Sequence, residues 1–493
     1  MVQFFAFGVG WDNWFTHLFP DSANKQLITV TLNAQWQTIT IDLSQIDLRY
    51  CLGAFGWVAN SKGNAYRPIS FLIDSIWVDL PRLSDPRFLV SYETEYPASP
   101  DPLINGFDVV QVNTAYCYDN AVALLAFAAT GLKARSQLVA DALVYALDND
   151  RYWADGRLRN AYMGGDLTLP PGWLARGKPN TVRMSGWYDA AKKAWFEDAY
   201  NVSSNTGVMA WACLSLLAFY GLYGGHSYLA AVERIAGWII ANCESNSKNH
   251  TFTAGQEGWE PDAAGTPSGA FRIRTYEATE HSIDLYAVFS RLYQITGKVT
   301  YDVAAQRAFN FATRIAWNQP GQEFYTGTDD SGVLQNFVGS VIPLDIQVWS
   351  LMSLRDQNTP YLGTLDTVER LHALQGGYGF CQTSAVRNSV TLADGVKNSL
   401  AAGVWYEGTA HVAAAHRLFG SQSKYTDLVL FLDGARFASG AMPAASVDKL
   451  DTGFDLNDGK PWIYLHRAHV GATSWFVLAT APDPVNPFWL GSE

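Results

Sequence analysis

Residues 280–293 read EHSIDLYAVFSRLY, an acidic residue followed by small and apolar side chains. A helix wound from this stretch would be hydrophobic on nearly every face, as in a helix buried inside a protein. Two further acids stand nearby: Glu277 precedes Glu280, and Asp284 follows it by one helical turn on the same face. Because charges are costly to bury, acids at the start of a buried helix require a structural or chemical explanation.

The same layout occurs six times along the chain, with a polar or acidic residue before a segment rich in alanine, leucine, glycine and aromatics. The segments are YDNAVALLAF (118–127), NTGVMAWACLSLLAF (205–219), EHSIDLYAVFSRLY (280–293), LDIQVWSLMSL (344–354), EGTAHVAAAHRLF (407–419) and HVGATSWFVLA (469–479). They start about 60 to 90 residues apart, the length of one helix pair with its connections.

Amphipathic stretches separate these segments, with apolar residues recurring at i, i+3 and i+4. The clear ones are 134–148, 227–243, 301–317, 365–374 and 425–438. We therefore predict a mainly α fold, an (α/α)6 barrel (toroid) over residues 83–493, with the apolar helices inside and the amphipathic ones outside. Residues 85–115 are a poor candidate for the sixth outer helix. One wall is thus expected to be irregular or closed by the N-terminal segment.

Residues 1–82 instead alternate apolar and polar side chains with period two, which is typical of strands. The predicted strands are QLITVTL (26–32), WQTITIDL (36–43), GAFGWVA (53–59) and ISFLIDSIWVDL (69–80), with turns at Asn24, Asn33, Gly53 and Gly63. The last three strands resemble the closing half of a jelly-roll carbohydrate-binding module. We interpret residues 1–82 as a small, partial antiparallel β-sandwich that either binds sugar or caps the next domain.

Composition limits the possible functions. The net charge is −12 and the pI about 5.2, which argues against nucleic acid and polyanionic substrates because both require a basic surface. The 18 Trp, 24 Tyr and 26 Phe residues suit a large core or an aromatic-lined site. No apolar run reaches the ~18 residues of a membrane span, so no span is expected. The N-terminal stretch MVQFFAFGVGWDNWF lacks the basic start and cleavage site of a secretory leader.

Motifs for cofactors and metals are missing from the sequence. There is no GxSxG, GxGxxG or P-loop pattern, and the five cysteines are scattered without CxxC spacing. A metal site built from Glu280, His281 and Asp284 is disfavoured, since His281 would lie about 100° around the helix from Glu280. We therefore expect no cofactor and no metal, and free buried thiols rather than disulfides.

The barrel predicts a functional site. Its inner helices would run parallel, so their N-termini would gather at one end and surround Asp119, Asn205, Glu280, Asp345, Glu407 and His469. Asp198 and Arg159 lie in loops expected at the same end. Carboxylates and aromatics with few lysines suit a neutral polyhydroxylated ligand. The alternative is that Asp119, Asn205, Asp345 and Glu407 cap their helices, that Glu280 complements the helix dipole and that Asp284 is a structural acid.

The motifs EATEHSIDLYAVF, PLDIQVW, VWYEGTA and HVGATSW resemble those of bacterial (α/α)6-barrel glycoside hydrolases and related polysaccharide-active proteins, over about residues 90–490. The resemblance implies a glycosidase of neutral poly- or oligosaccharides that uses a carboxylate acid/base pair, very often with inversion. It makes Glu280 the general acid and one of Glu407, Asp345 or Asp198 the base. The expected substrate-binding residues are Tyr118, Asp119, Arg159, Trp211, Trp259, His281, Trp349, Trp405 and His469. Tyr118, Trp211, Trp259 and Trp405 would stack on sugar rings.

The resemblance also implies a secreted or periplasmic protein, with the cytoplasm left open, and it leaves the oligomeric state open. Two other functions remain. A polysaccharide lyase would abstract a proton with His281, His469 or Tyr286 and neutralise a uronate with arginine. A non-catalytic glycan-binding protein would have a tryptophan-lined cleft without two facing carboxylates.

Overall fold

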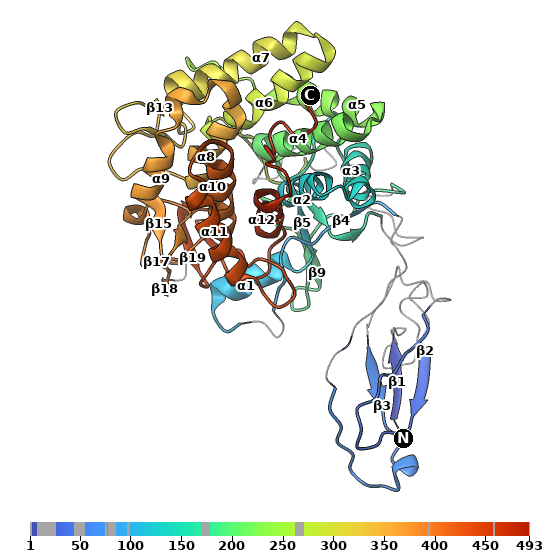
Figure 1. Ribbon diagram of the computed structural model, residues 1–493. Helices are drawn as coiled ribbons and strands as arrows, with labels where there is room; N and C mark the ends of the chain where they lie inside the picture. The colour runs from blue at the N-terminus through green and yellow to red at the C-terminus, as the bar shows by residue number, and fades with distance from the viewer. Residues whose placement is uncertain are drawn as a thin grey trace. The chain divides into compact units, whose positions relative to one another are not determined.

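The computed structural model describes residues 2–6, 26–43, 55–73, 76, 85–95, 99–168, 178–261, 271–392, 395–456 and 459–492. The chain divides into two compact units (Figure 1): Met1–Ser84 with Thr168–Asn180, and Asp85–Leu167 with Thr181–Glu493. Residues 168–180, predicted as part of the barrel domain, group with the first unit.

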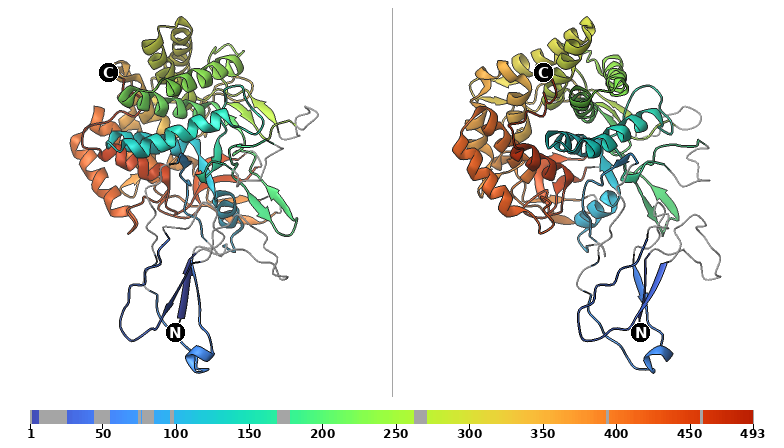
Figure 2. Two further views of the ribbon diagram at one scale, coloured as in Figure 1. Left: turned by 90° about the vertical axis from the view of Figure 1, so that its right-hand side faces the viewer. Right: turned by 45° about the vertical axis from the view of Figure 1, so that its right-hand side comes forward.

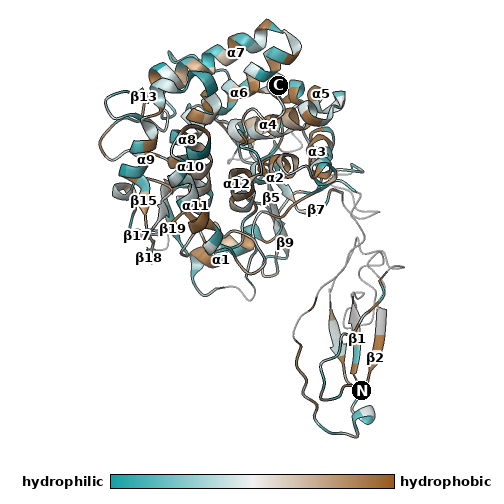
Figure 3. Cartoon of the chain, viewed as in Figure 1, coloured by the Kyte–Doolittle hydropathy of each residue, from teal (hydrophilic) through white to brown (hydrophobic). Residues whose placement is uncertain are grey.

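Helices of the second unit form a closed ring in which each contacts the next and the last contacts the first. Within the described residues these inner helices are α2 (Cys117–Ala129), α4 (Thr206–Tyr223), α6 (Thr279–Thr296), α8 (Leu344–Leu354), α10 (Tyr406–Phe419) and α12 (Val470–Thr480). Most of their residues are buried, as their all-round hydrophobicity predicts, and α2 and α12 are brown along much of their length in Figure 3. The predicted (α/α)6 barrel is confirmed.

Five outer helices pack on the ring, each against the inner helix that precedes it in the chain. They are α3 (Lys133–Asp148), α5 (His226–Cys243), α7 (Val299–Asn310), α9 (Thr364–His372) and α11 (Gln422–Ala435). All five amphipathic predictions are thus confirmed. A further α-helix of the described residues, α1 (Pro102–Gln111), begins at Asp101, whose side chain accepts hydrogen bonds from the Leu103 and Ile104 N–H groups.

One wall of the barrel is irregular, as predicted. On the outer side of α2 and α12 the described residues leave a cavity of about 670 Å³, lined mainly by apolar side chains of these helices and of residues 89–93. It lies where a sixth outer helix would pack. None of the carboxylates predicted for the site lines this cavity.

Short antiparallel strands occupy the connections that lead into the inner helices. They are β4 (Arg87–Phe88), β5 (Thr114–Tyr116), β6 (Ala161–Met163), β7 (Gly165–Asp166), β8 (Trp187–Asp189), β9 (Ala194–Phe196), β10 (Ser204–Asn205), β11 (Gly255–Glu257), β12 (Arg272–Arg274), β13 (Trp317–Asn318), β14 (Glu323–Phe324), β15 (Ala373–Leu374), β16 (Gly377–Tyr378), β17 (Ser389–Thr391), β18 (Lys397–Ser399), β19 (Leu450–Asp455) and β20 (Pro461–Tyr464). They pair as two- or three-stranded ladders. This places the strands at the end of the ring where the inner helices begin.

The chain after α12 crosses the other end of the ring. The Arg291 guanidinium donates hydrogen bonds to the Phe488 and Leu490 carbonyls at 3.1 and 2.7 Å, and the Trp489 indole donates to the Ser353 carbonyl at 2.9 Å. The Phe488 ring packs edge-on against Trp211, with 5.1 Å between ring centroids. These contacts close the C-terminal end of the ring.

The first unit contains one described antiparallel sheet of β1 (Val2–Ala6), β2 (Gln26–Val30) and β3 (Gly56–Val58), in the order β2-β1-β3. β2 and β3 confirm two predicted strands. Residues 36–43 and the described part of 69–80 are not in strands, and Asn24 and Gly53 lie outside the described residues. A β-sandwich is not confirmed. Alternation marks a strand only if a neighbouring strand exchanges hydrogen bonds with it.

Helix α4 departs from the sequence expectation about membrane spans. Its 18 residues have a mean hydropathy of 1.5, long and apolar enough to cross a membrane. In the structure α4 is an inner helix of the ring, and 72% of these residues are buried. Its hydrophobicity is therefore explained by packing between α2 and α6.

Candidate active site

The N-terminal ends of the inner helices carry the polar residues that the sequence singled out. Asp119 on α2, Asp345 on α8 and Glu407 on α10 are buried, as is His469, the residue before α12. Glu280, in the first turn of α6, is only partly buried. Hydrogen-bond and ion-pair contacts join Asp119, Glu407 and His469, and Glu280 and Asp345 feel the charge of Glu407, although these groups are spread over most of the second unit.

Glu407 lies at the centre of a hydrogen-bonded group. The Tyr118 hydroxyl donates to its Oε1 at 2.5 Å, and the Trp475 indole N–H donates to the Tyr118 oxygen at 2.8 Å. His411 Nε2 lies 3.7 Å from Oε1, and His469 Nδ1 lies 3.5 Å from Oε2. Helices α2, α10 and α12, the last with its N-cap residue His469, thus surround this carboxylate.

These partners keep Glu407 ionised. Burial alone would raise its pKa, but the nearby His411 ring, the positive charge of His469 and the hydrogen bond from the Tyr118 hydroxyl hold the pKa below its usual value. Burial lowers the pKa of His411 itself, so that ring is neutral near pH 7. We therefore attribute the charge effect on Glu407 to His469.

His469 bridges two carboxylates. Its Nε2 lies 3.3 Å from both oxygens of Asp119, and its ring stacks on Tyr92 with 4.2 Å between centroids. Burial disfavours the charged ring, but the charges of Asp119 and Glu407 outweigh it and raise the pKa of His469. Nδ1 also accepts the Ala472 N–H at 3.3 Å when it is unprotonated. Protonation would redirect Nδ1 from the α12 backbone to Glu407.

Glu280 and Asp345 have the opposite tendency. Burial, followed by the charges of Asp345 and Glu407, raises the pKa of Glu280 to about 8. Burial, together with the charge of Glu407, raises the pKa of Asp345 to about 7, against a hydrogen bond from the Ile346 N–H at 2.8 Å. Asp284, one turn along α6, is fully buried, and burial raises its pKa well above normal. The site therefore contains the ionised Glu407 together with Glu280, which keeps its proton near neutral pH.

The capping alternative is wrong for most of these residues. Asp119, Asp345 and Glu407 lie in the first turns of α2, α8 and α10 and not at the N-cap positions, whose side chains make no capping bond. Asp345 does accept the Ile346 N–H of its own helix. Glu280 lies in the first turn of α6, where an acid complements the helix dipole. Asn205 does cap α4, because its side chain accepts hydrogen bonds from the Gly207 and Val208 N–H groups. The acids are thus free to interact with one another.

Other predicted site residues hold loops. Asp198 accepts the Tyr200 and Asn201 N–H groups in a turn, at 2.9 and 3.2 Å. Arg159 is buried and forms ion pairs with Asp150 at 2.5 Å and Glu260 at 3.0 Å.

Trp259 is half-buried and packs against the main hydrophobic core. Glu277, whose role the sequence left open, is fully buried and accepts hydrogen bonds from Ser245 at 2.5 Å and from Ser247 and Asn249. Trp259 therefore serves packing, and Glu277 ties the loop of residues 245–249 to the start of α6.

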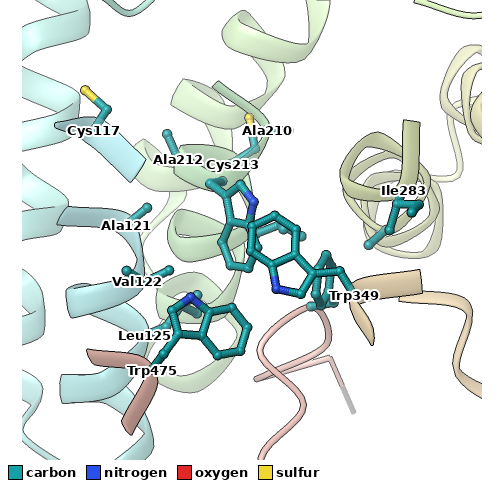
Figure 4. Packing of buried hydrophobic residues seen from close by; sticks show 14 of the residues in the cluster. Cys117, Ala121, Val122, Leu125, Ala210, Ala212, Cys213, Ile283, Trp349 and Trp475 are labelled. Carbon is teal, nitrogen blue, oxygen red and sulfur yellow. The ribbon is translucent and has the colours of Figure 1, made fainter. Parts of the chain in front are cut away.

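Trp211, predicted to stack on sugar, and Trp349, predicted to bind substrate, form the floor of the ring together with Trp475. Trp211 and Trp349, with Trp475, are each the sixth residue of their helices, and Figure 4 shows Trp349 and Trp475 pointing into the interior of the ring. The ring centroids of Trp211 and Trp349 lie 4.8 Å apart, and both rings contact the Phe488 ring. Because their faces are covered by other rings, they position the site rather than offer a free face to a sugar.

Trp405 and His281 are also enclosed. Trp405 is 3% exposed and packs against Phe380, with 4.7 Å between centroids. His281 packs beside Gly207, where a Cβ would lie 2.4 Å from the imidazole Cδ2. Burial lowers the pKa of His281 to about 4, so it is a neutral ring at the start of α6.

Several residues of the site were not predicted from the sequence. His411 follows Glu407 by about one helical turn, and Trp475 follows His469 by nearly two. Both are the sixth residue of their helices, as Trp349 is, and this shared position could have predicted that they meet inside the ring. Tyr92 gave no periodic signal. It reaches His469 because the segment around it pairs with residues 468–470: the Glu93 N–H donates to the Ala468 carbonyl and the Val470 N–H to the Ser91 carbonyl.

The described residues contain no group of three or more His, Cys, Asp or Glu side chains arranged to hold a metal ion. Cys117, Cys213, Cys243 and Cys381 are buried free thiols.

No family model matches the sequence, and no curated protein is similar to it. Solved structures do share its overall arrangement. A sugar epimerase from a ruminal bacterium is 10% identical, with 76% of this chain and 89% of that chain covered and a TM-score of 0.47. A cellobiose 2-epimerase from Bacillus thermoamylovorans is 8% identical, covering 74% and 88%, with a TM-score of 0.47. A family 76 glycoside hydrolase (mannosidase) from Bacteroides thetaiotaomicron is 10% identical, covering 79% and 92%, with a TM-score of 0.44.

The (α/α)6 barrel is established by the closed ring of helices in this chain itself. Similarity as distant as these scores carries no argument about the reaction. The function has to be inferred from the site itself.

Proposed function

We propose that this protein is a glycoside hydrolase that cleaves a neutral poly- or oligosaccharide with a carboxylate acid/base pair. The observation that supports it is the opposite pKa shifts of neighbouring acids. Glu407 is held ionised, while Glu280 has a pKa of about 8 and keeps its proton near neutral pH. Glycosidic bond cleavage needs both forms at once, one carboxylic acid and one carboxylate.

In this mechanism Glu280 donates its proton to the glycosidic oxygen as the bond from that oxygen to C1 breaks. Glu407 accepts a proton from water as the water oxygen bonds to C1 from the opposite face, which inverts the configuration. His469 stabilises the carboxylate form of Glu407 until that transfer. Asp345, whose pKa is about 7, helps to keep Glu280 protonated by placing negative charge near it.

The test is reducing-sugar release from a panel of neutral glycans, with Glu280→Gln and Glu407→Gln variants. We expect each variant to lose at least a hundredfold in kcat, because each amide can neither donate nor accept the required proton. The anomeric configuration of the first product, read by NMR, tests inversion. Full activity in both variants would refute the assignment of the site. A product absorbing near 235 nm would instead indicate the lyase.

A second candidate function is epimerisation of a sugar. It is favoured by His281, His411 and His469, three buried imidazoles at the same end of the ring, of which His281 and His411 are held neutral by burial. A neutral imidazole can remove a proton from carbon beside a carbonyl group, and a second group can return one to the other face. Incorporation of solvent deuterium into carbon without release of new reducing ends would distinguish this reaction from hydrolysis.

A further inference from the structure

An exposed hairpin in the connection between α3 and α4 carries aromatic side chains on both faces. Its strands are β8 (Trp187–Asp189) and β9 (Ala194–Phe196), and Tyr188 pairs directly with Trp195. Paired residues of an antiparallel ladder project to the same side of the hairpin. Figure 2 shows this hairpin as green arrows that project from the barrel unit.

The two faces of the hairpin differ. Trp187 and Phe196 are partly buried and stack on each other at 6.3 Å with an interplanar angle of 22°. On the opposite face Tyr188 is 61% exposed and Trp195 48% exposed. The face with Trp187 and Phe196 therefore packs internally, whereas the face with Tyr188 and Trp195 exposes two large rings to water. Such an exposed apolar group is typical of a binding surface.

The hairpin is also firmly held. The Asp189 side chain accepts the Ala191 and Lys192 N–H groups at 2.9 and 3.0 Å and fixes the turn. At the base, the Asn113 side chain donates to the Gly186 carbonyl at 2.8 Å and accepts the Gly186 N–H at 3.1 Å. A rigid surface binds without losing conformational entropy, which favours a built site over a loose loop.

The Trp195 ring lies over a glycine. A Cβ at Gly186 would lie 2.7 Å from two atoms of the indole, so only glycine lets the ring settle against the backbone there. One side of the indole is thus supported while nearly half of the residue stays accessible. This is the geometry of a stacking platform.

The hairpin is continuous with the candidate active site. Asn113, which holds its base, directly precedes β5 (Thr114–Tyr116), and β5 leads into α2 with Tyr118 and Asp119. Between the hairpin and α4 the chain passes through Tyr200, whose ring centroid lies 6.2 Å from that of Tyr116. Asp189 pairs with Lys192 at 3.5 Å, and the exposed Lys193 in the turn adds one positive charge. The two rings of the platform are themselves uncharged and therefore suit the apolar faces of a ligand that extends outward from the site.

We propose that Tyr188 and Trp195 form a remote subsite that stacks on pyranose rings of a neutral polysaccharide and holds the polymer beside the carboxylate cluster. This proposal rests on the proposed glycosidase function and adds that the substrate is a polymer longer than the catalytic site itself. Flat rings bind the apolar faces of sugars, and two rings on one rigid face bind successive units of one chain.

The experiment uses affinity electrophoresis of the full chain through native gels that contain soluble α-mannan, mixed-linkage β-glucan, xylan or amylopectin. The Tyr188→Ala/Trp195→Ala variant is compared with Tyr293→Ala, an exposed tyrosine near the C-terminal end of α6 (40% exposed). We expect at least one polymer to retard the wild type and Tyr293→Ala, and the double variant to lose at least 10-fold in affinity. On that polymer its kcat/KM should fall at least 10-fold more than on a trisaccharide.

The possible results separate the two proposals. Retardation of the wild type by a polymer, lost in the double variant but without hydrolysis, supports the platform and refutes the glycosidase. Hydrolysis of oligosaccharides with equal retardation of wild type and double variant, or with no retardation by any polymer, refutes the platform alone. A change from dimer to monomer in the double variant, measured by light scattering, also refutes it. If the alanine variant fails to fold, Tyr188→Leu/Trp195→Leu keeps apolar bulk without flat rings and must show the same loss.

Discussion

Replacing Glu280 by glutamine should make the protein more stable at alkaline pH while abolishing its activity. The pKa of Glu280 is about 8 in the folded protein, against 4.5 for an ordinary glutamate. The folded state therefore binds this proton more tightly than the unfolded state. The stability that the proton contributes is fully present below pH 4.5 and is lost as the pH rises through 8.

The magnitude follows from the shift. At about 1.36 kcal/mol per pKa unit, wild type should lose about 3.5 kcal/mol of unfolding free energy from this group between pH 5 and pH 8. Solvent screening on the partly exposed side of Glu280 reduces the expected loss to about 2–3 kcal/mol. Glutamine does not titrate, so Glu280→Gln should not show this part of the loss.

The assay is urea unfolding at pH 5 and pH 8, followed by tryptophan fluorescence, with free energies from linear extrapolation. Glu93→Gln, which changes an exposed glutamate of the same unit, is the matched control and should follow the wild type. If the difference between wild type and Glu280→Gln is the same at both pH values within about 0.5 kcal/mol, Glu280 does not have a raised pKa. The assignment of the general acid would then fail.

Three further outcomes are expected. The pH profile of kcat/KM should be bell-shaped, with an acidic limb below pH 4.5 from Glu407 and a basic limb near pH 8 from Glu280; a limb above pH 9.5 would contradict the assignment. His469→Gln should raise the pKa of Glu407 and move the acidic limb of kcat/KM upward by roughly one pH unit. If the acidic limb stays in place, His469 is not the charge that stabilises ionised Glu407. Gly471→Ala places a Cβ 2.8 Å from Asp119 Oδ1 and Glu407 Oε2, so kcat should fall by about 100-fold. In its control Gly237→Ala, with nothing within 4 Å, kcat should be unchanged and thermal unfolding should show a gain of up to about 1 kcal/mol.

The sequence predicted most of the barrel because helix burial is encoded locally. All-round hydrophobicity in segments such as 280–293 marks an inner helix, and its alternation with amphipathic stretches fixes the parallel direction of the inner set. The irregular wall was expected because residues 85–115 are a poor candidate for an outer helix, and the described helix there, α1, has only ten residues. The N-terminal strands were predicted less well. Residues 36–43 alternate correctly but have no described strand partner, and pairing depends on chain that is distant in sequence.

The sequence predicted best those site residues whose place in the fold follows directly from their position on a helix. Glu280, Asp345 and Glu407 meet because they begin parallel helices. Arg159 lies at the expected end of the barrel, yet its donors are occupied by Asp150 and Glu260. Trp211 lies on an inner helix, as expected. It is about one and a half turns from the start of that helix, which places it in the floor of the ring and not at its mouth. Such outcomes depend on which partner fills a given space, and residue spacing does not encode that.

The sequence by itself therefore determined the ring of helices and the gathering of acids at one end of it. Only the tertiary structure decided which acid is ionised. Glu407 and Glu280 look alike as sequence, each an acid in the first turn of an apolar helix. Their pKa values diverge because Tyr118, His411 and His469 surround Glu407, while Glu280 faces burial and two other carboxylates. Coulomb energies and desolvation depend on distances of a few ångströms between residues far apart in the chain, and those distances exist only in the folded protein.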